Sequence, residues 1–388
     1  MEITEVEIHE FRYRVEDVGP RPDGEMVYVP GSAIEPPGYV LQIRTADGTE
    51  GHYRAHMWAP VGAAQIEAVA DHFLIGRDPL AREEIWSDLR RQLRHTDHNA
   101  LGAIDVALWD LAGRHHGTSV ATLLGGRRRD RVPAYASTMS GNPERDTPER
   151  YAGFAADCLA RGYGGFKIHP HGDPDADAEI CRAVADRVGG EMDLMLDPAS
   201  LYQSYADTLR VGRVMDECGF FWYEDPMADT GESMAMEKKL ADELDTPILG
   251  MEHVRGGAFG RADHLAAGAL DFVRGDAHLD GGITGLMKVA STVEAFGLDV
   301  EPHVGGPAHL HCLAAIRNAN YFEHGLLHPE IEWMSASGFT EPVAVPDDAG
   351  RVAVPDGPGL GVEIDWEYVE ANETRHTLID GSGSGAFA

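Results

Sequence analysis

A chain of 388 residues is longer than one small core requires and predicts about two domains, at roughly 150 residues each. Its hydrophobic content of 43% excludes general disorder, and no apolar run approaches the roughly 18 to 20 residues of a membrane span. Asp and Glu number 65 against 32 Lys and Arg, a net charge of −33 that makes nucleic acid and anionic membranes poor partners.

The basic residues are almost all arginine, because only Lys167, Lys238, Lys239 and Lys288 are lysines. A fold this acidic repels itself in dilute buffer, whereas molar salt shortens the Debye length to about 3 Å. We therefore expect a salt-adapted protein. The N-terminus resembles no targeting segment, which predicts an unprocessed cytoplasmic protein. The four cysteines are far apart, so neither a zinc ribbon nor a disulfide scaffold is expected.

Residues 1–127 are predicted to form an α+β domain. Segments 3–15 and 38–55 alternate polar and apolar residues, as half-exposed strands do. Three helical stretches follow, and the last of them, 99–117, repeats its apolar residues at three-to-four spacing before it stops at Gly117.

Two further segments are assigned from composition. The Pro- and Gly-rich stretch 17–38 is predicted to be a loop long enough to act as a lid. A C-terminal extension at about 350–380 is expected to complete the N-terminal α+β domain, and residues 381–388 to form a flexible tail.

Residues 128–349 are predicted to form a barrel domain, because short apolar strands there alternate with helical segments. No G-x-G-x-x-G occurs at a strand-to-helix turn, which argues against a dinucleotide-binding fold. Eight strands without a sequence repeat favour a closed parallel barrel over an open doubly wound sheet. The candidate strands are 132–137, 163–168, 192–197, 220–225, 246–252, 271–276, 298–303 and 318–324.

Ionisable residues recur near the ends of these strands, from the second strand onward. They follow one another at intervals of about one β-α unit, and barrel chemistry is found at the carboxyl ends of strands. The spacing therefore predicts that all of them surround one mouth of the barrel. The residues are Lys167, Asp197, Glu224, Glu252, Asp276, His303 and Glu323.

Three of these residues, Asp197, Glu224 and Glu252, lie on successive strands. Neighbouring strands are about 4.8 Å apart, so three carboxylates there can meet one hard divalent cation. Without a cation their mutual repulsion is costly. Ligation by oxygen alone favours Mg²⁺ over Zn²⁺ and leaves positions open for water and a substrate carboxylate.

The next two strands carry Asp276 and His303. A carboxylate bonded to one imidazole nitrogen fixes the tautomer and raises the basicity, which makes His303 a candidate general base. Lys167 and His169 are two residues apart on one strand, so both are expected to face the interior. Glu323 is a candidate donor to a substrate carboxylate, provided that its pKa is raised.

At these residues the sequence resembles the mandelate racemase subgroup of the enolase superfamily. The resemblance extends from the first strands to about residue 340. Its motifs are residues 100–126, LMLDPAS at 194–200, FWYEDP at 221–226, ILGMEH at 248–253, residues 280–303 and YFEH at 321–324.

The resemblance implies an α+β capping domain over a modified (β/α)7β barrel of the TIM type. It implies Mg²⁺ on Asp197, Glu224 and Glu252, a base dyad of His303 and Asp276, and an acidic helper at Glu323. It also implies an enolate intermediate, a small carboxylate substrate such as a sugar acid, and an even-numbered homo-oligomer.

One departure from the subgroup affects the reaction. Many members carry K-x-K on the second barrel strand, where the second Lys is a base, but here the motif is Lys167-Ile168-His169. A two-base racemase therefore needs His169 as its second base. Elimination needs one base and one acid, so we favour a sugar-acid dehydratase with His303 as base and His303 or His169 as acid. The alternatives are a racemase, epimerase or cycloisomerase acting through the same enolate, and a binding or regulatory barrel without turnover.

Other residues carry weaker expectations. Arg274 and Glu301 lie two residues before Asp276 and His303, and strand alternation predicts a buried ion pair between them. Possible pocket contacts, each with an ordinary structural role as the alternative, are Tyr28, His52, His56, His253, His309 and His311.

Overall fold

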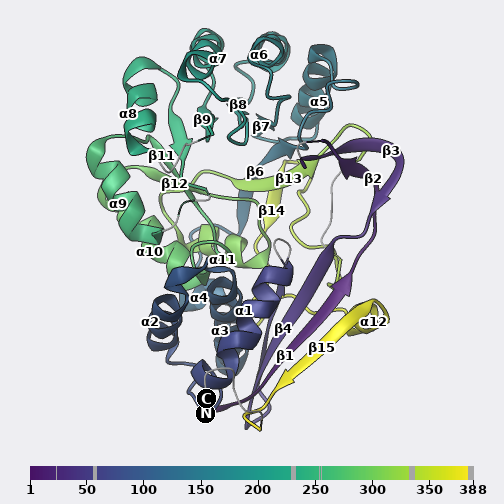
Figure 1. The fold of residues 1–388 in the computed structure, drawn as a ribbon, viewed down its shortest axis with the longest axis vertical. Coiled ribbons are helices and arrows are strands. Elements are labelled where there is room, and N and C mark those ends of the chain that lie inside the picture. Colours follow the sequence, from purple (N-terminus) through teal and green to yellow (C-terminus); the bar gives the residue numbers. More distant parts are fainter. Residues whose placement is uncertain are drawn as a thin grey trace.

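The fold is taken from a computed structural model, which describes residues 1–22, 24–55, 59–228, 233–252, 254, 256–331 and 337–382. Figure 1 shows two regions, a helix-backed antiparallel sheet and a ring of parallel strands surrounded by helices.

The smaller region is a four-stranded antiparallel sheet with strand order β15-β1-β4-β5. Helices cover one of its faces, and the strand from the C-terminal end of the chain lies at its edge (Figure 1). The strands are β1 (Ile3–Arg12), β4 (Pro37–Thr45), β5 (Glu50–Ala55) and β15 (Glu373–Ile379). The helices are α1 (Ala59–Phe73), α2 (Arg82–Gln92), the 3₁₀ turn η1 (Leu93–His95), α3 (Asn99–His116) and α4 (Val120–Leu123).

Helix α3 is the central helix of this region and is buried along most of its length. It approaches β5 closely because Gly51 has no side chain; a Cβ there would lie 2.2 Å from the carbonyl oxygen of Ala107. The helix stops at Gly117, which adopts φ 63°, a left-handed conformation that glycine tolerates. The end predicted from the sequence is therefore confirmed.

The predicted loop 17–38 is wrong, because most of it forms a two-stranded antiparallel hairpin, β2 (Val15–Pro20) and β3 (Met26–Ile34). The glycines and prolines of this stretch favoured a loop, although Val18, Val27 and other residues of high strand propensity lie between them. A tight connection joins the strands, with the Arg21 amide donating to the carbonyl oxygen of Glu25 at 2.7 Å.

The larger region is a nearly closed barrel of eight parallel strands, and all eight predicted strands are present. They pair in the order β12-β11-β10-β9-β8-β7-β6-β13. Between the two end strands the amide of Val300 donates to the carbonyl oxygen of Asn318 at 2.9 Å. The strands are β6 (Arg131–Thr138), β7 (Gly165–Ile168), β8 (Asp193–Leu196), β9 (Trp222–Glu224), β10 (Ile248–Gly250), β11 (Phe272–Gly275), β12 (Asp299–Pro302) and β13 (Phe322–Leu327).

Helices connect successive strands and surround the barrel (Figure 1). Side chains of Thr147, Asp173 and Ser204 cap three of them by accepting hydrogen bonds from backbone amides of the first turn. The helices are α5 (Pro148–Ala160), α6 (Pro174–Val188), α7 (Tyr205–Cys218), α8 (Met234–Glu243), α9 (Gly257–Ala267), α10 (Gly282–Ala295) and α11 (Pro307–Ala315). Strand β14 (Arg351–Ala353) pairs with β6, and α12 (Trp366–Ala371) precedes β15.

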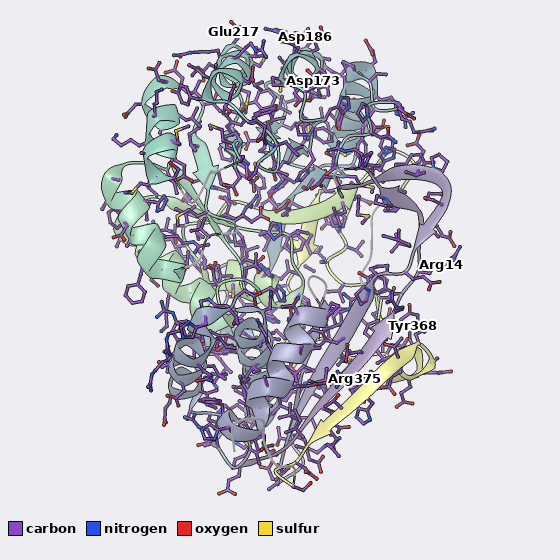
Figure 2. All side chains as sticks on the ribbon, viewed as in Figure 1. Arg14, Asp173, Asp186, Glu217, Tyr368 and Arg375 are labelled. Carbon is purple, nitrogen blue, oxygen red and sulfur yellow. The ribbon has the colours of Figure 1, made fainter. Side chains whose placement is uncertain are left out.

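The barrel interior contains an apolar cluster formed by Tyr135, Met195, Trp222 and Leu249. Acidic residues project outward from the helix layer, as Asp173, Asp186 and Glu217 do in Figure 2. Within the described residues, the helices are all too short or too polar to cross a membrane.

Candidate active site

Three carboxylates meet at the carboxyl ends of adjacent barrel strands. Asp197 follows β8, Glu224 is the last residue of β9, and Glu252 lies two residues beyond β10. One oxygen from each lies within 4.8 Å of the other two. Asp197 and Glu224 are buried, and Glu252 is partly exposed. The structure therefore brings together the three residues that strand spacing selected.

The Lys167 ammonium group lies beside these carboxylates. Its Nζ is 3.1 Å from Asp197, 3.0 Å from Glu224 and 2.8 Å from Glu323, and its side chain is 1% exposed. Burial alone would lower the pKa of Lys167, but the surrounding carboxylates hold it well above the usual range. Lys167 is therefore a fixed positive charge.

Arg274 is a second buried cation in the barrel, but its partner is not the predicted one. Its guanidinium pairs with Glu224, at 2.8 Å from Nε, and lies 3.5 Å from Glu323. It meets Glu301 through the backbone carbonyl oxygen at 3.3 Å.

The predicted Arg274–Glu301 ion pair is therefore wrong, although both side chains are buried. The Glu301 carboxylate instead accepts hydrogen bonds from the amides of Asn320 and Tyr321, where the barrel closes. The long Arg274 side chain reaches past β10 to Glu224 on β9. Glu224 is buried, and a buried carboxylate without a positive partner carries a large desolvation cost.

Asp276 and His303 form the predicted hydrogen-bonded pair, with 2.9 Å between Oδ2 and Nδ1. The Nε2 atom of His303 is 3.2 Å from Glu252, so the free edge of the ring faces the carboxylate trio. Burial alone would lower the pKa of His303, but Glu252 and Asp276 raise it to about 9. His309, which sequence reasoning left open, lies 3.4 Å from the other oxygen of Asp276.

His169 stands beside the trio from β7. Its Nε2 is 2.9 Å from Asp197, and its Nδ1 is buried without a hydrogen-bond partner in the described structure. Burial would lower the pKa of His169, but Asp197 outweighs this effect and raises it. The ring therefore interacts with the trio through one nitrogen and borders the cavity, while its second nitrogen is buried.

Glu323 was expected to donate to a substrate carboxylate only if its pKa is raised, and the structure gives the opposite direction. Burial would raise its pKa, but Lys167 and Arg274 lower it well below the usual range. Glu323 is consequently an ionised acceptor in this arrangement and does not hold a proton to donate.

A cavity of about 610 Å³ opens over these residues, between the barrel mouth and the capping sheet. Its walls include His169, His303 and Glu323 from the barrel. The capping region adds Tyr13, His52 and Arg54, and the segment after β11 adds His278. Sequence reasoning named His52 but missed Arg54, although strand alternation places both on the same face of β5.

The remaining sequence candidates are distributed differently. Tyr28 is buried and stacks on His328 with ring centroids 4.4 Å apart. His311 bonds the Ala121 amide and the carbonyl oxygen of Leu360, which is a structural role. His56 and His253 lie outside the described residues.

The donor set fits a hard divalent cation. Three carboxylate oxygens converge, and oxygen ligands are those that Mg²⁺ prefers. The neighbouring Asp225 is affected by the excess of negative charge at the trio. Burial, and after it the charges of Glu252 and Glu224, raise the pKa of Asp225 well above the usual range. A cation at the trio would relieve this repulsion.

Fold and site together define an enolase-type enzyme, a cap over a barrel whose mouth carries three acidic residues beside a histidine. Family models match at residues 30–125, as a mandelate racemase/muconate lactonizing enzyme N-terminal domain, and at 150–369, as an enolase C-terminal domain-like region. The chain belongs to this mandelate racemase/muconate lactonizing enzyme group of the enolase superfamily.

Individual relatives include several sugar-acid enzymes. The crystal structure of D-glucarate dehydratase from Agrobacterium tumefaciens complexed with magnesium superposes with a TM-score of 0.89 at 36% identity, over 97% of this chain and all of that one. D-galactarolactone cycloisomerase of Agrobacterium fabrum is 30% identical, covering 84% of this chain and 88% of the relative. L-talarate/galactarate dehydratase of Salmonella typhimurium is also 30% identical, covering 84% and 80%.

Proposed function

We propose that this protein is a Mg²⁺-dependent dehydratase that removes the proton α to a carboxylate of a sugar acid and expels the β-hydroxyl group as water. The observation that carries the proposal is the position of His303, whose Nε2 atom faces the carboxylate trio while its Nδ1 atom is held by Asp276. A base held beside a carboxylate-lined cation site suits abstraction of a weakly acidic proton.

Asp197, Glu224 and Glu252 would hold Mg²⁺. When bound, this ion would supply positive charge that stabilises the negative charge developing on the substrate carboxylate. Lys167 adds a fixed cation on the opposite side of the trio from His303 and stabilises the same developing charge.

Proton transfer falls to the two histidines. His303 takes the α-proton at Nε2 in its neutral form, which a cation at Glu252 would favour by offsetting the negative charge that raises the pKa of the ring to about 9. The Asp276 carboxylate stabilises the resulting imidazolium through Nδ1. Either His303 or His169 then gives a proton to the departing hydroxyl group. His309 accepts a hydrogen bond from the Ala277 amide at Nε2, 3.4 Å from the second oxygen of Asp276, and so acts as a positioning residue for the segment that carries this carboxylate.

Arg54 points to the substrate class. It is 6% exposed, with Nε and Nη1 donating to backbone carbonyl oxygens of Ser337 and Ala55. Its guanidinium lies 4.9 Å from the centre of the Tyr13 ring, and its buried Nη2 has no hydrogen-bond partner among the described residues. Within the described residues no carboxylate pairs with it, and it lines the cavity from the cap. A buried cation with a free donor suits a second substrate carboxylate, so we propose a dicarboxylic sugar acid.

The direct experiment is a screen of sugar acids with Mg²⁺ in molar KCl, detecting 2-keto-3-deoxy products. His303→Asn and Asp276→Asn should lower turnover by about 10² to 10⁴-fold. His95→Asn, which changes an exposed histidine on η1, should have no effect. A folded protein that turns over no carboxylate, or one in which the His303 and Asp276 variants remain fully active, would contradict the proposal.

Galactarate and galactonate test the substrate class, because they differ at one end. Arg54→Gln should lower kcat/KM for galactarate by about 10 to 100-fold, since it removes a charged hydrogen bond, and should leave galactonate nearly unaffected. A preference of the wild-type enzyme for galactonate would refute the role of Arg54 but not the dehydratase proposal.

An epimerase or cycloisomerase is the second candidate, because His169 and His303 both border the cavity and a cycloisomerase is among the relatives. Incubation in deuterated water separates the reactions. Recovered substrate with an inverted, labelled α-carbon would favour epimerisation, whereas a dehydrated keto acid favours elimination.

A further inference from the structure

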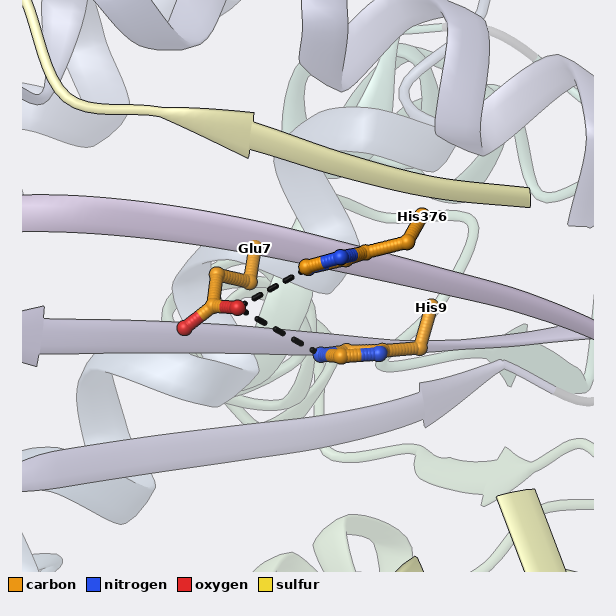
Figure 3. A group of neighbouring side chains, drawn as sticks. All are labelled: Glu7, His9 and His376. Carbon is orange, nitrogen blue, oxygen red and sulfur yellow. Dashed lines mark hydrogen bonds and ion pairs between the residues drawn. The ribbon is translucent and has the colours of Figure 1, made fainter. Parts of the chain in front are cut away.

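Two histidines and a glutamate meet on the capping sheet, where β1 pairs with β15 (Figure 3). Glu7 and His9 lie on β1, on the face opposite Val6 and Ile8, which pack into the main core. His376 on β15 is the register partner of His9, and the two rings stack with centroids 4.4 Å apart. None of the three residues borders the catalytic cavity.

His9 is oriented as a metal ligand would be. Its Nδ1 atom is 2.8 Å from the Glu373 carboxylate, and contacts of this kind orient the ring of a metal-binding histidine. Its other ring nitrogen, Nε2, lies 3.8 Å from Oε2 of Glu7.

Glu7 divides its two oxygens between different partners. Oε1 lies 3.3 Å from the Arg44 guanidinium, whereas Oε2 faces both imidazoles, 2.9 Å from Nε2 of His376 and 3.8 Å from Nε2 of His9. Arg44 thus anchors the carboxylate through one oxygen. Figure 3 shows the other oxygen directed at the two rings.

The spacing of the donor atoms suits a tetrahedral ion. Ligands at roughly 2.0 to 2.1 Å from such an ion are separated by roughly 3.3 Å. The two measured separations from Glu7, 2.9 and 3.8 Å, lie on either side of that value, and all three donors lie within 4.8 Å of one another. Because the two rings stack with an angle of 14° between their planes, a shared ion requires the exposed His376 side chain to turn until its ring plane also contains the ion.

We propose that Glu7, His9 and His376 form a binding site for a divalent transition-metal ion of the Zn²⁺ type, separate from the catalytic centre. Two imidazoles and one carboxylate favour Zn²⁺, Ni²⁺ or Cu²⁺ over Mg²⁺. His9 is buried and His376 is exposed, so water can occupy the fourth position from the solvent side. The bound ion ties β15 to β1 and stabilises the capping sheet.

Zn²⁺ binding is measured by isothermal titration calorimetry on the full chain, in saturating Mg²⁺ and constant KCl so that the catalytic carboxylates stay occupied. Wild-type protein should bind one Zn²⁺ that His376→Gln and Glu7→Gln each weaken at least about tenfold. His95→Gln, which alters an exposed histidine elsewhere, should bind as tightly as wild type. Thermal unfolding gives the second readout, because Zn²⁺ should raise the wild-type Tm more than that of His376→Gln.

Glu373→Ala tests the orientation of His9 and should weaken Zn²⁺ binding about 10 to 100-fold without removing a ligand. Equal Zn²⁺ affinities of wild type and His376→Gln would overturn the proposal, as would wild-type protein that binds no Zn²⁺ beyond what the double variant His9→Asn, His376→Gln binds. Turnover enters neither readout, so the result is independent of the proposed dehydratase activity.

Discussion

The buried carboxyl group of Glu301 should make stability depend on pH. Burial raises its pKa from 4.5 to about 7, against the opposing effects of the Asn320 hydrogen bonds and the Arg274 charge. Because the folded state holds the proton more tightly than the unfolded chain, this group stabilises the fold most below pH 4.5, and the contribution is lost as the pH rises to about 7. A pKa difference of one corresponds to about 1.36 kcal/mol, so the full loss is about 3 kcal/mol.

Glu301→Gln removes the titration while keeping the shape of the side chain. In the variant the Gln amide group can place its NH2 opposite the Tyr321 backbone N–H, and two donors facing each other cost about 1 kcal/mol at every pH. The informative quantity is therefore the slope of the unfolding free energy against pH. Urea unfolding at pH 5 to 8 in constant KCl should show wild type losing about 2 to 3 kcal/mol relative to the variant. Glu191→Gln, an exposed site, controls for the loss of one charge. Parallel pH profiles of wild type and Glu301→Gln would refute the reasoning.

Three further outcomes are expected. The double variant Asp276→Asn, His303→Asn should be no slower than the slower single variant, because the pair acts as one unit; additive losses in kcat would contradict this. Gly282→Ala should lower the unfolding free energy, measured by calorimetry, by about 1 to 3 kcal/mol. Gly282 has φ 86°, and a Cβ there would lie 2.2 Å from Asp105. Gly153→Ala is the control and should be neutral or stabilising, because Gly153 lies within α5 with open space around its Cβ position. Removing Mg²⁺ with EDTA should lower Tm and abolish turnover, and re-addition should restore both, with an unchanged Tm counting against a carboxylate-bound cation.

The barrel and its carboxylates could be predicted because both follow from local rules. Each β-α unit has a similar length, so an ionisable residue at one strand end repeats its position at the next. Asp197, Glu224 and Glu252 therefore came together as expected. The Asp276–His303 contact followed from the same logic, since adjacent parallel strands place corresponding residues side by side.

The wrong or missed predictions have three causes: the reach of a long side chain across the barrel, turn-forming residues inside a hairpin, and contacts between segments that are distant in the sequence. Strand alternation gave the interior direction of Arg274 but not which carboxylate its flexible side chain would find. The hairpin at 15–34 was hidden because turn-forming residues outweighed its short runs of β-formers. Arg54 was missed because its surroundings include Ser337, which is 283 positions away in the sequence.

The capping sheet uses strands from both ends of the chain, and this has a consequence for biosynthesis. β1 emerges from the ribosome early, yet its neighbour β15 is made last. Until then one edge of β1 keeps its backbone groups unpaired, and such an edge invites association with other nascent chains. A chain truncated before Glu373 would thus keep the barrel strands but leave that edge open, so quality control of this enzyme should be sensitive to truncations that remove β15.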